Sequence, residues 1–123
     1  MHELPNGAGL LAVAREVLLS DIVPHLPADK VLAARMVANA MGIAAREAAQ
    51  DAGWIADARA RMAALAGDAT DPLRRFAAAI RAGAFDPGTA QHQAAAALLR
   101  EITRARCAVS APRALAERCG DGR

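Results

Sequence analysis

Aromatic and β-branched residues are scarce in this sequence of 123 residues. It contains no Tyr, two Phe and one Trp, and Val, Ile and Thr together number fourteen. Because β-branched residues are the natural strand formers, their scarcity excludes an all-β fold. The shortage of aromatic rings on which bases stack also excludes a platform for single-stranded nucleic acid.

A strong net charge is missing as well. Fifteen Lys and Arg residues stand against thirteen Asp and Glu, which gives a net charge of +2. The positive excess lies in residues 91–123, but it is too small and too dispersed to mark a nucleic-acid-binding protein. We therefore expect no nucleic-acid partner.

The sequence also lacks the usual residues of a metal or catalytic site. Its only cysteines, Cys107 and Cys119, have no zinc-type spacing, and His2, His25 and His92 lie far apart along the chain. No Glu-x-x-His pair and no glycine-rich phosphate loop is present. We predict no catalytic residue, no metal and no cofactor, and an enzyme acting alone would need a nucleophile that the sequence does not reveal.

Long apolar runs are absent. The longest stretch without a charged residue covers positions 87–99, thirteen residues, whereas a membrane span needs about twenty apolar residues. The first residues also lack the basic and apolar regions of a signal peptide. We expect a cytoplasmic protein with no membrane partner.

Alanine is what the sequence has in abundance, at thirty-five positions. Alanine is the best helix former, and apolar residues recur at helical spacing between Pro and Gly punctuation. In the first predicted helix, Arg15 and Glu16 lie opposite the apolar face. The pattern predicts five helices, at about residues 8–22, 28–50, 54–67, 72–83 and 90–108.

Helix boundaries are clearest at Asp71-Pro72, because an Asp cap followed by Pro at the first helical position is a typical helix start. The connections between the predicted helices are short, which favours antiparallel neighbours. We predict an all-α single domain over residues 1–123, an up-and-down bundle of about five helices. Its ordered core would cover about residues 8–113, followed by a short helix or frayed tail over 114–123.

One stripe on the second predicted helix combines polar residues with a glycine. Arg35, Asn39, Gly42 and Arg46 follow each other at spacings of four, three and four residues, so they share one side of the helix. Two guanidinium groups beside an amide could bind an anionic group such as phosphate or the head group of an acyl-CoA. The alternative is an ordinary solvated helix face. Both interpretations stay open at this point.

Four segments of the sequence resemble a small bacterial domain family of unknown function. They are residues 1–5 (Met-His-Glu-Leu-Pro), 35–40 (Arg-Met-Val-Ala-Asn-Ala), 79–83 (Ala-Ile-Arg-Ala-Gly) and 112–113 (Pro-Arg). The sequence departs from the family pattern by carrying Ala111, where the family has Asn, and by continuing to Arg123.

The resemblance implies an association with other proteins, and it implies no particular activity. Members of the family occur alone, or encoded with or fused to aminoglycoside-phosphotransferase-like kinases and acyl-CoA dehydrogenases. Alanine-rich helices also leave a thin core, so we expect part of the apolar surface to be covered by another chain. Our first hypothesis is a non-catalytic helical accessory module that forms a homo-oligomer or binds such a kinase-like or dehydrogenase partner. The alternative is a small-molecule-binding domain that recognises an anionic group through Arg35, Asn39 and Arg46.

Overall fold

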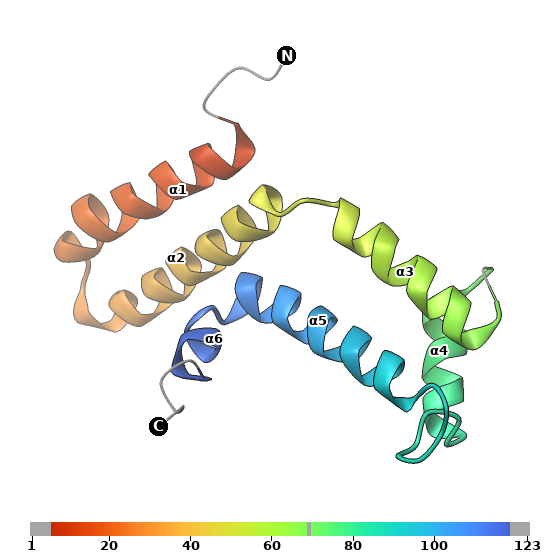
Figure 1. The fold of residues 1–123 in the computed structure, drawn as a ribbon. Helices are drawn as coiled ribbons and strands as arrows, with labels where there is room; N and C mark the ends of the chain where they lie inside the picture. Colours follow the sequence, from red (N-terminus) through yellow and green to blue (C-terminus); the bar gives the residue numbers. More distant parts are fainter. Residues whose placement is uncertain (1–5, 69, 119–123) are drawn as a thin grey trace. The chain divides into compact units, whose positions relative to one another are not determined.

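A computed structural model of the chain describes residues 6–68 and 70–118, and these residues form an all-α single domain (Figure 1). The predicted fold class is thereby confirmed, and the described residues contain no strand. By its internal contacts the domain divides into two compact units, residues 1–50 with 108–123 and residues 51–107. The α-helices are α1 (Gly7–Val17), α2 (Ala28–Ala49), α3 (Gly53–Ala66), α4 (Pro72–Arg81), α5 (His92–Ser110) and α6 (Arg113–Arg118).

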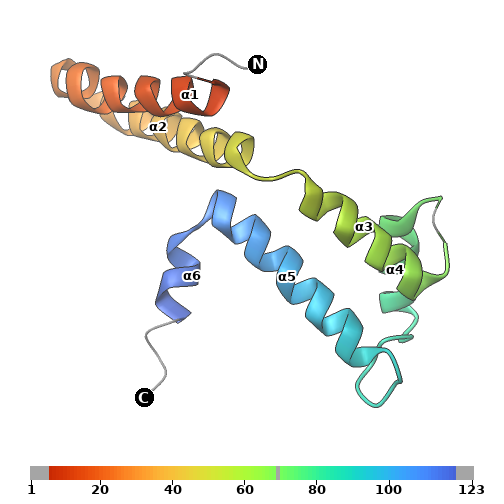
Figure 2. The ribbon, with the colours of Figure 1, turned by 45° about the horizontal axis from the view of Figure 1, so that its top comes forward.

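The first unit is built on α1 and α2, which lie side by side and antiparallel in both views of the ribbon (Figures 1 and 2). The start of α1 is capped by Asn6, whose Oδ1 accepts a hydrogen bond of 2.9 Å from the amide of Gly9. Pro24 lies in the turn between the two helices, and Pro27 directly precedes α2. The two prolines end the first helical segment as the sequence predicted, since neither can continue a helix.

The backbone hydrogen-bond pattern changes within the helix predicted over residues 8–22. It is α-helical to Val17 and continues as a π-helix over Leu18–Ile22, where the amide of Val23 donates to the carbonyl of Leu18. Leu18 and Leu19 are both half-buried. A regular α-helix turns consecutive side chains about 100° apart, so the wider turn changes which side chains after Val17 face α2.

The contact between α1 and α2 is made by small side chains. The more buried side of α2 carries apolar residues at helical spacing, namely Val31, Ala34, Ala38, Met41 and Ala45. Only Ala38 and Gly42 are fully buried in α2, and α1 buries no residue completely. The first unit therefore has little core of its own.

The second unit contains α3, α4 and most of α5. The predicted cap at α4 is present, with Asp71 Oδ1 accepting from the amide of Arg74 at 3.4 Å and Pro72 at the first helical position. Gly67 ends α3 in the left-handed conformation, with φ of 74°, which favours glycine because it has no Cβ.

The core of the second unit gathers around the two phenylalanines. The rings of Phe76 on α4 and Phe85 in the following turn have centroids 5.3 Å apart, a tilted arrangement that is favourable for aromatic pairs. Phe76 and Leu98 are the largest side chains that are almost fully enclosed, at 2% and 1% exposed. The whole buried cluster consists of Ala58, Met62, Phe76, Phe85, Ala95 and Leu98.

In the second unit, four apolar residues that helical spacing places on inward faces are exposed instead, namely Ile55, Leu73, Ile80 and Leu99. Neighbouring helix positions point about 100° apart, so Leu98 and Leu99 cannot both face the same core. Phe76, Phe85 and Leu98 belong to the buried core of this unit, and Leu73 and Leu99 do not. Within the described residues, no helix has the length and apolarity that crossing a bilayer requires.

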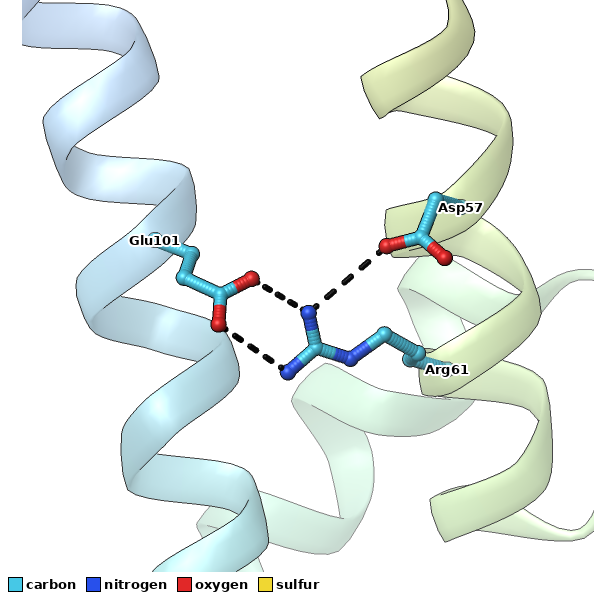
Figure 3. Close-up of polar contacts among 3 residues, drawn as sticks. All are labelled: Asp57, Arg61 and Glu101. Atoms are coloured by element: carbon cyan, nitrogen blue, oxygen red, sulfur yellow. Dashed lines mark hydrogen bonds and ion pairs between the residues drawn. The ribbon is translucent and has the colours of Figure 1, made fainter.

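Arg61 links two helices of the second unit through its guanidinium group (Figure 3). The group lies between Asp57, one turn earlier on α3 at 3.6 Å, and Glu101 on α5. Glu101 accepts from both terminal nitrogens, and the longer of these two contacts is 3.4 Å. The hydrogen bond from Arg61 holds the pKa of Glu101 below its ordinary value, while the same bond raises the pKa of Arg61.

Replacing Phe76 with alanine is expected to lower the free energy of unfolding by about 3–5 kcal/mol, because it removes the largest enclosed side chain of the core and leaves a cavity. The matched control is Leu73→Ala on the same helix, where the side chain is 54% exposed. Urea denaturation followed by circular dichroism measures both. Equal midpoints for Phe76→Ala and Leu73→Ala would show that the core is not centred on the ring.

The Arg61–Glu101 pair is expected to stabilise the protein only above acidic pH. The pKa of Glu101 is lower in the folded state, so the stabilisation is complete above the unfolded value of about 4.3 and is lost as the pH falls through the folded value. The melting temperature of Glu101→Gln should therefore lie below that of the unmodified protein at neutral pH, and the difference should shrink in acid. The control is Glu47→Gln, which removes a carboxylate without a described ion pair and should not lower the melting temperature at neutral pH.

Candidate functional site

The four residues of the predicted stripe all lie on α2, but in different surroundings. Gly42 is buried, Arg46 is half-buried, and Arg35 and Asn39 are exposed. The structure thus places the C-terminal half of the stripe, Gly42 and Arg46, in contact with other parts of the first unit. The N-terminal half faces solvent.

Arg15 reaches the stripe from the neighbouring helix α1. A Cβ atom built on Gly42 would lie 3.3 Å from Arg15 Nε and 3.3 Å from Arg46 Nη1. Both guanidinium groups therefore lie directly against the backbone of α2 at this glycine. We call Arg15, Gly42 and Arg46 the arginine cluster.

Arg46 is fixed by a second contact. Its Nε donates a hydrogen bond of 2.7 Å to the carbonyl of Val109, in the last turn of α5 and within the same compact unit. This bond is partly buried, and a charged donor makes it stronger than an ordinary amide bond. Arg46 therefore ties α2 to the segment that leads into α6.

The arginine cluster carries two positive charges and no negative one. Arg61 and Arg75 form ion pairs, whereas neither Arg15 nor Arg46 forms one with a described residue. Two positive charges thus meet at one glycine without a described carboxylate beside them. Such an arrangement can accept an anion, since each guanidinium offers several donors in one plane.

No pattern in the sequence indicated a role for Arg15. It lies 27 positions before Gly42, and the helical pattern placed it opposite the apolar face of its helix. The side chain nevertheless extends to α2, because a long Arg stem can run along apolar surface while its charged end stays in water. Periodicity describes where Cβ points and does not fix where the end of a long side chain lies.

The histidines and cysteines of the chain are not part of the arginine cluster, and two of them lie outside the described residues. His92 Nδ1 donates to the carbonyl of Phe85 at 2.8 Å, at the start of α5. The same region carries a shallow, mostly apolar hollow beside Asp86 and Leu99. Cys107 is a half-buried free thiol, while Cys119 and His2 lie outside the described residues. The described part of the chain contains no group of three His, Cys, Asp or Glu side chains placed to hold a metal ion.

Replacing Arg46 with methionine keeps the apolar stem of the side chain but removes its hydrogen bond to Val109. The protein should therefore become less stable. We expect Arg46→Met to lower the free energy of unfolding by about 1.5–3 kcal/mol, the usual range for a hydrogen bond that involves a charged group. Arg35→Met on the same helix should change it by less than about 0.5 kcal/mol, as exposed substitutions usually do. Urea titration measures both, and similar losses for the two variants would contradict the role assigned to the Val109 contact.

Comparison with known proteins identifies one family. A model of a domain of unknown function, DUF6285, matches residues 24–114. The matched segment includes α2, Gly42, Arg46 and Val109, whereas Arg15 lies before it. No curated protein and no solved structure matches the chain. Because the match covers well over half of the sequence, the chain belongs to the DUF6285 family of domains of unknown function.

Proposed function

We propose that this protein is a non-catalytic helical interaction module of the cytoplasm that self-associates through α2. The observation that carries the proposal is the exposure of two large apolar side chains on that helix. Leu32 is 71% exposed and Met36 is 65% exposed. They lie one turn apart, on a side of α2 largely turned away from the residues that pack toward α1.

The surface around these two residues contains no charge at its centre. Leu32, Ala33, Met36 and Ala40 are all exposed and share this side of the helix, and we call them the outer α2 face. Together with the half-buried face toward α1, they make α2 apolar on two sides. A helix that is apolar on more than one side is typical of a buried position, with a neighbour on each side.

A second copy of the chain is the partner that suits this face best. The face carries no excess charge that would select an oppositely charged protein, and an apolar patch can meet its own copy across a twofold axis. Alanine at two of its four positions allows helix axes to approach closely. Two α1–α2 hairpins joined in this way would form a four-helix arrangement, and this would supply the core that one hairpin lacks.

A heterologous protein is the alternative partner. The sequence resemblance favours an aminoglycoside-phosphotransferase-like kinase or an acyl-CoA dehydrogenase in that role. In that case the purified chain would be a monomer by itself and would form a complex only when the second purified protein is added.

The test is the molar mass in solution. Light scattering coupled to size-exclusion chromatography should give a dimer for the unmodified chain, and a monomer of unchanged helicity for the double variant Leu32→Glu, Met36→Glu. Two carboxylates in an apolar contact face would have to be desolvated without partners, which opposes association. Leu73→Glu on α4, where the native side chain is 54% exposed, is the matched control and should remain dimeric.

Two outcomes would contradict self-association through this face. One is a monomeric mass for the unmodified chain across the accessible concentration range. The other is a dimer that persists in the double variant, which would place the contact elsewhere.

A further inference from the structure

We infer that the arginine cluster is a binding site for the phosphate group of a small molecule. It is distinct from the outer α2 face, since none of its residues belongs to that face. Phosphate binding at this cluster does not depend on whether the chain self-associates.

Two like charges converge at Gly42. Arg15 comes from α1 and Arg46 from α2, yet Arg15 Nε and Arg46 Nη1 both lie 3.3 Å from the Cβ position of Gly42. Two cations held this close repel each other, and no described carboxylate forms an ion pair with either. An anion bound between them would convert the repulsion into attraction.

The glycine at position 42 leaves room for the two guanidinium groups. Gly42 is buried in the interior of α2, where glycine costs roughly 1 kcal/mol relative to alanine. Its φ is not in the left-handed region, because the described glycines with positive φ are at positions 67, 83 and 88. Backbone conformation therefore does not call for glycine here. What glycine provides is space, since a Cβ at this position would press on both guanidinium groups.

One of the two guanidinium groups, that of Arg46, is already held in place. The hydrogen bond from Arg46 Nε to the Val109 carbonyl uses one donor and leaves the terminal nitrogens for other acceptors. Holding a side chain before the ligand arrives lowers the entropy cost of binding. Arg15 is exposed, so the ligand would enter from the solvent side.

The donor set fits a tetrahedral oxyanion. Two guanidinium groups from different helices can each donate to separate oxygens of one phosphate, and charge-assisted bonds of this kind are the strong ones. Asn39 lies three positions before Gly42 on the same stripe, and its exposed amide adds a neutral donor. A phosphate monoester would be bound through its charged end, with the rest of the molecule in solvent.

The experiment is an NMR titration of the uniformly 15N-labelled chain with inorganic phosphate, at ionic strength held constant with sodium chloride. The Nε–H signals of Arg15 and Arg46 should shift and saturate together. Arg15→Gln should weaken binding by about tenfold or more, the effect of losing a charge-assisted hydrogen bond worth at least about 1.4 kcal/mol. The side chain of Arg15 forms no described hydrogen bond or ion pair, so this variant should fold normally.

Two further variants separate a site from a general charge effect. Arg59→Gln on α3 removes the same charge from an exposed arginine of the second unit, and phosphate affinity should stay within about twofold. Gly42→Ala should keep the fold, since the crowded atoms belong to flexible side chains, but should weaken phosphate binding by displacing both guanidinium groups. Shifts that rise linearly without saturating, or equal losses for Arg15→Gln and Arg59→Gln, would overturn the site.

Discussion

The shortage of large apolar side chains is the constraint on which the rest of this structure depends. With thirty-five alanines and three aromatic residues, helix contacts bury little area per residue, and hydrophobic stabilisation scales roughly with that area. The two phenylalanines lie in the same unit and in contact with each other. The second unit thereby obtains a compact core, while the first unit has to rely on alanine, a glycine and half-buried aliphatic residues.

Polar contacts compensate for the small buried apolar area, and they do so differently in the two units. In the second unit Arg61 joins α3 to α5 on the surface, where an ion pair contributes modestly to stability but restricts how the two helices are aligned. In the first unit Arg46 reaches a backbone carbonyl instead. The carbonyls near the end of a helix lack intrahelical partners, so an arginine from another helix can satisfy one of them. Arg61 and Glu101 are 40 positions apart in the sequence, whereas 63 positions separate Arg46 from Val109.

Most of the helices could be predicted from the sequence, because proline, glycine and cap residues mark their ends locally. Asp71-Pro72 and Gly67 are examples in which a few neighbouring atoms decide the boundary. The π-helical turn at Leu18–Ile22 and the burial of Phe85 in a turn could not be predicted, since both depend on what packs against them. For the candidate site, spacing placed Arg35, Asn39, Gly42 and Arg46 on one stripe. It could not show that Arg15 would meet only the second half of that stripe.

The π-helical turn has a consequence for how the first unit tolerates changes in chain length. Such a turn contains one residue more than an α-helical turn. Deleting a single residue between Leu18 and Ile22 would let the segment close as a regular α-helix, while the side chains before Val17 kept their orientation toward α2. The same deletion within α1 would rotate every later side chain by about 100°. The turn is therefore the position at which this hairpin can lose a residue and still keep Arg15 where it is.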